Sequence, residues 1–169
     1  MKKYLGLILS AVAFIFAGCC FLTLMAPAVT VSWTLLGKTS SGSMSGYDMI
    51  SNGGGLYIAA IVHVGVALAL IACVFALDAV KAKFKFKKLV SFLPAIVLIV
   101  AAVDFFLAVP CLNMMNSDDV NEAIGYVGKL VDLKKSLGFG AIGSGALAIL
   151  ASLTMICKTL RKESRTKKR

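Results

Sequence analysis

Residues 56–77 read LYIAAIVHVGVALALIACVFAL, residues 78–88 read DAVKAKFKFKK, and residues 89–112 read LVSFLPAIVLIVAAVDFFLAVPCL. Each apolar segment is long enough to span a bilayer, because a transmembrane helix needs about 20 predominantly apolar residues. The lysine-rich turn between the segments belongs on the cytoplasmic side by the positive-inside rule. The stretch therefore predicts a transmembrane helical hairpin with a cytoplasmic turn.

The rest of the chain also has the composition of a membrane protein. Its 169 residues are 59% hydrophobic, above the roughly 45–50% apolar content of soluble domains. The apolar residues gather in four blocks, at residues 4–30, 56–78, 89–112 and 137–160. We expect an all-α protein with a single domain at residues 1–160, an integral membrane bundle of four transmembrane helices. A disordered basic tail is expected at residues 161–169.

The positive charges are distributed unevenly along the chain. The formal net charge is +10, and fourteen of the eighteen Lys and Arg residues lie near the N-terminus, in the 78–88 turn or from Lys158 onward. These three places share one side of the membrane in a four-span topology. The pattern predicts cytoplasmic N- and C-termini in a plasma membrane, and it favours a bacterial one. The turn and tail are expected to attract anionic lipids, and no nucleic-acid partner is expected.

Residues 1–31 permit two interpretations. Met-Lys-Lys followed by an apolar run to Val31 is typical of an uncleaved transmembrane helix, with Pro27 marking its outer end. Phe16-Ala17-Gly18-Cys19 also has the outline of a bacterial lipobox, in which Cys19 would carry the lipid. We favour the uncleaved helix, because a signal h-region is about 7–15 residues long and this sequence stays apolar after Cys19.

Two segments are expected on the outer side. Residues 32–55 are rich in Ser and Gly and predict a mobile loop, with Trp33 and Tyr57 at the membrane boundary. Residues 113–136 predict a short amphipathic helix, which Asp119 and Glu122 would begin as a capping box. Its apolar positions at helical spacing are Val120, Ala123, Ile124, Val127, Leu130 and Val131.

Small residues recur every four positions in two of the expected helices. The two series are Gly140, Ser144, Ala148 and Ser152 in the fourth segment and Gly65, Ala69 and Cys73 in the second. In lipid, small residues let helix backbones approach closely, either within one chain or against a partner subunit. We favour packing within the chain.

Two ionisable residues lie inside the hairpin segments, His63 in the first and Asp104 in the second. Counted from the outer ends of the segments, each lies about 10–12 Å deep at about 1.5 Å per residue. A charge that faces lipid costs at least about 2.5–3.5 kcal/mol, so we expect both side chains to point inward and to meet. Such a pair either holds a proton or an ion or locks two helices by a buried hydrogen bond, and we favour the lock.

The five cysteines do not suggest a redox site. Four-span bacterial thiol oxidoreductases, which pass electrons to quinones, are similar to this chain in size and topology. Their activity needs cysteine pairs in the outer loops, and this sequence has none there. No Cys-x-x-Cys, metal-ligand cluster, nucleophile elbow or phosphate loop occurs. We expect no catalytic, cofactor-binding or metal-binding residues and no enzymatic activity.

Trp33 follows soon after the first expected span, and Gly55-Leu56-Tyr57 lies at the second. With these residues, the four-span topology is similar to that of claudin-like tetraspans. The paired loop cysteines of that family are missing and the first loop is too short. The similarity therefore implies a common architecture and no residue roles.

These features give two expectations about function. The first is a non-enzymatic membrane protein that acts as an accessory, scaffold or assembly component and contacts another membrane protein or itself. The second is a small proton- or ion-coupled transporter or channel that uses the His63/Asp104 pair.

Overall fold

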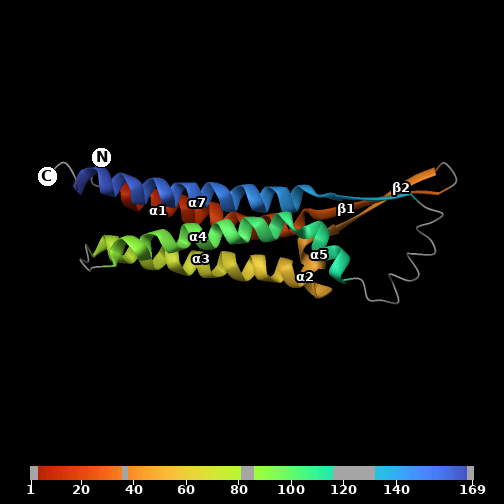
Figure 1. Ribbon diagram of the computed structural model, residues 1–169, viewed down its shortest axis with the longest axis horizontal. Coiled ribbons are helices and arrows are strands. Elements are labelled where there is room, and N and C mark those ends of the chain that lie inside the picture. Colours follow the sequence, from red (N-terminus) through yellow and green to blue (C-terminus); the bar gives the residue numbers. More distant parts are fainter. Residues whose placement is uncertain (1–3, 36–37, 81–85, 116–131, 167–169) are drawn as a thin grey trace.

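A computed structural model describes residues 4–35, 38–80, 86–115 and 132–166 of the chain. It is mostly helical, with four long helices that lie side by side (Figure 1): α1 (Leu5–Leu22), α3 (Gly55–Ala79), α4 (Lys87–Phe106) and α7 (Phe139–Thr166). Each contains a stretch long and apolar enough to cross a membrane, so the expectation of four such helices is confirmed. α1 begins and α7 ends at one end of the bundle, which we call the terminal end.

The four long helices form a ring in which each contacts two neighbours. α1 contacts α7 and α3, and α4 contacts α7 and α3. Much of the core is alanine, which lets helix backbones approach closely where lipid provides no hydrophobic drive. The fully buried alanines in the helices include Ala13, Ala17, Ala60, Ala67, Ala95, Ala101, Ala141, Ala148 and Ala151. Larger side chains such as Ile99 and Leu153 lie on the outside of the ring.

The third apolar segment is broken near its end. It was expected to run to Leu112, but α4 ends at Phe106, and a separate helix α5 (Ala108–Met115) follows Leu107. Pro110 explains the break, because proline has no N–H to donate to the carbonyl four residues earlier and its ring clashes with that carbonyl. Here that carbonyl belongs to Phe106. Pro94, expected close to the start of the segment, lies inside α4.

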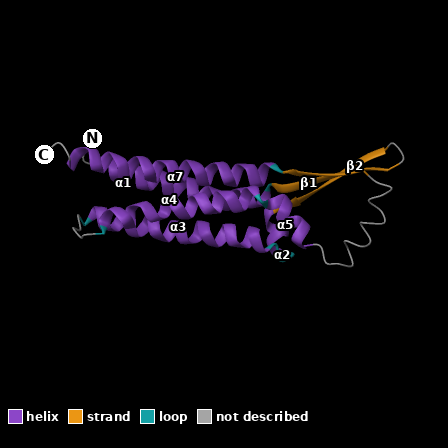
Figure 2. Ribbon diagram, in the orientation of Figure 1, coloured by secondary structure: helices purple, strands orange, loops and turns teal. Residues whose placement is uncertain are grey.

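A small sheet at the other end of the bundle corrects the all-α expectation. Its strands are β1 (Pro27–Leu35), β2 (Lys38–Ser45) and β3 (Asp132–Leu137), and its antiparallel order is β2-β1-β3. The sheet continues beyond the helices along the long axis of the bundle (Figure 2). The Ser- and Gly-rich segment expected to be a mobile loop is therefore largely a hairpin. Its first strand alternates Val29, Val31 and Trp33 with hydroxyl side chains, a pattern typical of strands.

The second outer segment is only partly described. Residues 120–131, which were expected to form an amphipathic helix, lie outside the described part of the chain. Asp132 and Lys135 were expected on the polar side of that helix, but both belong to β3. The strand pairs with β1, from Val29 opposite Leu137 to Thr34 opposite Asp132. This long-range pairing is a tertiary contact that helical spacing alone does not reveal.

The two ends of the chain also differ from expectation. α1 stops at Leu22, and a 3₁₀ turn η1 (Thr23–Met25) leads into β1. The strand begins at Pro27, which was expected to end the helix. At the other end, α7 continues to Thr166, so most of the tail expected to be disordered is helical. Arg161, Lys162 and Arg165 belong to the last two turns of α7, where the helix dipole favours positive charge.

A short helix, α2 (Gly46–Ser51), joins the sheet to α3. Ser45 caps it: the Asp48 N–H donates to the Ser45 hydroxyl, while the Ser45 N–H and hydroxyl both donate to the Asp48 carboxylate. These donors, the Ser45 hydroxyl above all, lower the pKa of Asp48 below its ordinary value. The capping box therefore orders the segment between the sheet and the bundle.

The two series of small residues have different surroundings. In α7, Gly140, Ser144, Ala148 and Ser152 are all buried. A Cβ on Gly140 would lie 2.5 Å from the Ala26 carbonyl oxygen, so this series serves packing within the chain, as expected. In α3, a Cβ on Gly65 would have nothing within 4 Å.

Alanine substitutions at these two glycines should have opposite effects. Gly140→Ala is expected to destabilise the fold by about 1–3 kcal/mol, because backbone atoms cannot move away as a flexible side chain would. Gly65→Ala is expected to leave stability unchanged or slightly raised, since alanine favours helix and the space is open. Thermal unfolding in detergent measures both variants. Equal midpoints for the two would contradict the close approach of α7 to the segment between α1 and β1.

Candidate functional site

The structure brings His63 and Asp104 together between α3 and α4. His63 Nδ1 lies 2.8 Å from Asp104 Oδ2, within hydrogen-bond distance. Asp104 is 13% exposed, whereas the His63 side chain is 37% exposed. The pair therefore lies at the seam between two neighbouring helices, with the carboxylate inside and the imidazole partly outside. Only the carboxylate matches the expectation that both side chains point into the bundle.

Small buried residues position the carboxylate. Ala101, on the same side of α4 as Asp104, is buried, and so are Ala108 and Cys111 in the following helix α5. On α3, Ala60 and Ala67 are buried on the inner side, and His63 lies beside them at the edge of the contact with α4. The α3–α4 packing thus holds the imidazole against the carboxylate. Such a pair can hold a proton or bind the two helices together.

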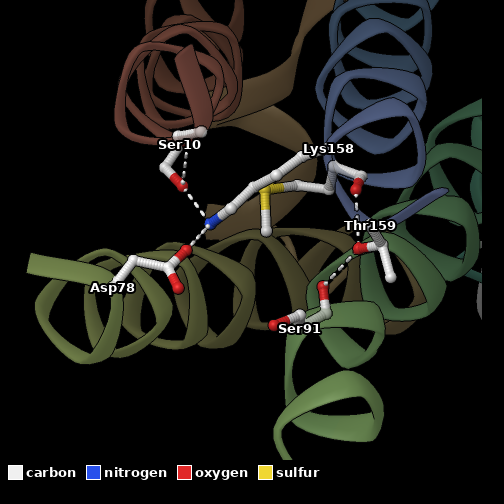
Figure 3. A network of polar contacts seen from close by, with 7 residues as sticks. Ser10, Asp78, Ser91, Lys158 and Thr159 are labelled. Atoms are coloured by element: carbon white, nitrogen blue, oxygen red, sulfur yellow. Dashed lines mark hydrogen bonds and ion pairs between the residues drawn. The ribbon is translucent and has the colours of Figure 1, made fainter. Parts of the chain in front are cut away.

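A second ionic pair lies near the terminal end of the bundle, and the sequence interpretation missed it. Figure 3 shows Lys158 of α7 reaching between α1 and α3, where its Nζ lies 2.9 Å from Asp78 Oδ2 and donates to the Ser10 hydroxyl. The side chain of Lys158 is 4% exposed and that of Asp78 is 13% exposed. One lysine therefore connects three helices through a buried ion pair and a hydrogen bond.

Neighbouring hydroxyls extend this network to the fourth helix. Thr159 donates to the backbone carbonyl of Ser91 in α4, at 3.4 Å, and to that of Met155 in its own helix. Ser152, two turns away, donates to the Ala95 carbonyl at 3.0 Å. Each of the four long helices thus has a polar contact in this half of the bundle.

The missed pair did leave a signal in the sequence. Lys158 was counted with the basic tail because of its sign, although it follows an apolar run and precedes Leu160. Asp78 is the only acidic residue beside the lysine-rich turn. An acidic residue beside many lysines is usually expected to be solvated. Only the depth of Lys158 within its helix would have indicated a buried ion pair.

A third polar cluster joins α1 to α7 near the sheet. The hydroxyls of Thr23 and Ser144 are in direct contact. Ser144 also donates to the Gly140 carbonyl at 2.8 Å, and its own carbonyl accepts a contact from the Cys20 thiol. These contacts are neutral, and their partners are largely backbone carbonyls. They are suited to holding helices together and offer no group that changes charge.

The cysteines form no disulfide. All five are free thiols, and Cys19, the residue of the lipobox-like motif, lies inside the continuous helix α1. Within the described residues, no group of three or more His, Cys, Asp or Glu side chains could hold a metal ion. The candidate site therefore consists of the two charged pairs.

Comparison with known proteins adds no relative. No protein-family model and no curated protein matches the chain. The function of its site is therefore inferred from the contacts of its own residues.

The His63–Asp104 contact can be measured by a double-mutant cycle. Asp104→Asn and His63→Ala are each expected to keep the fold, and their effects should be coupled by about 1 kcal/mol, as for other polar pairs between membrane helices. Unfolding in mixed micelles measures the wild type, the two single variants and the double variant. Lys134→Met, which removes an exposed charge of β3, serves as the control; additive effects of the two substitutions would contradict the pair.

Removing one member of the buried ion pair should be costly. Lys158→Met leaves the Asp78 carboxylate buried without its lysine, a change that typically costs about 3–5 kcal/mol. The double variant Lys158→Met/Asp78→Leu should recover much of that loss, because apolar replacement of a whole pair is often close to neutral. Unfolding measurements test this, with Lys134→Met at an exposed position of β3 as the matched control. A loss no larger than that of the control would show that the pair contributes little.

Proposed function

We propose that this protein is a non-enzymatic integral membrane protein that acts as a scaffold or assembly component. The observation that carries the proposal is the sheet, which extends beyond the helices along the axis of the bundle. Strands outside a bundle present backbone groups to other chains. Ionisable groups of the long helices form the pairs His63–Asp104 and Lys158–Asp78 within the chain, as expected if their role is to hold the scaffold together.

The proposed orientation follows from charge. Residues 78–88 and the stretch from Lys158 onward are rich in Lys and Arg, and α3, α4 and α7 have their adjoining ends at the terminal end of the bundle. By the positive-inside rule this end faces the cytoplasm, and the sheet faces outward. A bacterial plasma membrane accords with the same pattern. Anionic lipids are the expected partners of the basic turn and tail.

The second candidate function is proton- or ion-coupled transport. It is favoured by the His63–Asp104 contact, since an intramembrane carboxylate next to an imidazole can accept and release a proton. A second charged pair joins Asp78 of α3 to Lys158 of α7. Asp78 lies fifteen residues, or about 22 Å, along α3 from His63. Against transport, the charged pairs are separated by the alanine-rich core of the bundle.

Mild purification distinguishes the two functions. The scaffold proposal expects the protein to leave the membrane as a stable oligomer or with a stoichiometric partner, measured by light scattering and mass spectrometry of chemically cross-linked membranes. The transport proposal expects proton- or ion-dependent flux in liposomes that disappears in Asp104→Asn and persists in the control Asp48→Asn. A monomer without any cross-linked partner, together with such flux, would overturn the scaffold proposal.

A further inference from the structure

The outer edge of β2 carries backbone groups that pair with no strand in the described part of the chain. The Gly138 N–H donates to the Ala28 carbonyl at 2.8 Å, so even-numbered residues of β1 direct their backbone groups toward β3. The backbone groups of the odd-numbered β1 residues therefore point toward β2. The β2 residues opposite them, such as Gly42 opposite Val31, direct their own backbone groups toward β1. The intervening residues, Thr39, Ser41 and Ser43, direct their N–H and carbonyl groups to the free edge.

This edge lacks the features that usually block strand addition. Natural proteins protect edge strands with charged side chains, proline or bulges. From Thr39 to Ser45, β2 has no charge and no proline, and the single irregularity of its pairing lies at Pro27 and Val29. The opposite edge, β3, contains Asp132, Lys134 and Lys135. Among the described residues, no strand covers β2. The β2 edge is therefore the one that is open to another chain.

An aromatic ring lies beside the open edge. Trp33 is opposite Ser40 in the register, but a Cβ on Gly42 would lie only 3.4 Å from its ring. The indole therefore lies across the glycine of the edge strand, and it is still 39% exposed. An added strand could pack an apolar side chain on this ring while pairing with the backbone of β2. Lys38, exposed at the far end of the strand, offers a contact for an acidic residue.

A second copy in the same membrane does not fit this edge well. Two copies related by a two-fold axis along the membrane normal would have parallel β2 strands with identical backbone groups facing each other, and N–H would then meet N–H. Antiparallel pairing of two β2 strands needs copies that point in opposite directions, which copies inserted alike in one membrane do not provide.

Pairing of β2 with β3 of a neighbouring copy meets a steric obstacle. If the three-stranded sheets of neighbouring copies joined edge to edge, the copies would lie about 14 Å apart, at about 4.8 Å per strand. A bundle two helices wide occupies about 18–22 Å, given axes about 8–10 Å apart and helices about 10–12 Å in diameter. The bundles would collide before the sheets joined. The occupant that fits is a single extended segment with no bundle of its own beside it.

We propose that the open edge of β2, with Trp33 beside it, binds an extended segment of a second protein by strand addition. Recognition is mainly by the backbone groups of Thr39, Ser41 and Ser43, and the segment has an apolar side chain for Trp33 and an acidic residue near Lys38. The inference rests on the proposed scaffold role and names the surface and the partner chemistry for it.

A labelled peptide tests the edge directly on the full chain in lipid nanodiscs. The probe is a fluorescent peptide with the sequence of residues 27–35 and an aspartate added at its C-terminus. In the protein, this sequence forms β1 and pairs antiparallel with the other edge of β2, with Leu35 opposite Lys38. The added aspartate is meant to contact Lys38. Fluorescence anisotropy measures its binding. Saturable binding, weakened at least about tenfold in Ser41→Pro, is the expected result. Proline removes only an N–H that faces the free edge, so it is tolerated there.

Matched variants separate edge pairing from damage to the fold. Ser41→Ala keeps the N–H and should bind as the wild type does, and Trp33→Ala should bind several-fold more weakly. If Ser41→Pro unfolds by circular dichroism, Lys38→Glu gives a second test, with weaker binding expected. No wild-type binding up to about 1 mM peptide, or equal binding by folded Ser41→Pro, would overturn the proposal.

A further control addresses self-association. Disulfide cross-linking of Ser41→Cys between copies in vesicles would assign the edge to a second copy and also overturn the proposal. Failure of the peptide test with a partner still present after mild purification would leave the scaffold role intact and place the partner on another surface.

Discussion

In the membrane that we propose for this chain, helices are not driven together by the hydrophobic effect, and the whole bundle depends on how the chain replaces that force. It uses close approach of small residues and polar contacts between helices. Many of the buried residues are alanines, Gly140 of α7 touches the backbone between α1 and β1, and hydroxyls donate to carbonyls of neighbouring helices. Lys158 adds the strongest link, because its charge is buried among three helices and must keep its carboxylate.

The two charged pairs join the long helix α3 to two different helices, α4 and α7. Toward the sheet, His63 binds it to α4 through Asp104, and toward the terminal end Asp78 binds it to α7. Their exposures differ: Lys158 is sealed inside the bundle, whereas more than a third of His63 is exposed. A group that is sealed and paired serves structure. The His63 ring, at an exposed seam between two helices, is in contact with the surroundings of the bundle.

The four long apolar helices were predictable from the sequence, because about 20 apolar residues in a row are typical of a helix that can cross a membrane. The contact between His63 and Asp104 was also foreseen, from their matching depths and the cost of a charge in lipid. The sheet was not foreseen. Its central strand begins where an apolar run continues past Pro27, and its third strand pairs with residues about a hundred positions earlier. Lys158 was wrongly assigned to the basic tail because it is positively charged, and its burial depends on contacts with two other helices, α1 and α3.

The direct connection between strands and helices has a mechanical consequence. β1 is separated from α1 only by η1 and Ala26, and β3 from α7 only by Gly138. Hydrogen bonds in an antiparallel ladder lie perpendicular to the strands, so tension along the strands loads all of them together in shear. The sheet is therefore stiff along the bundle axis, and a force that pulls on it is transmitted to α1 and α7 together. Because both helices are pulled in the same direction, the load falls on their contacts with α3 and α4, among them the ion pair of Lys158 with Asp78.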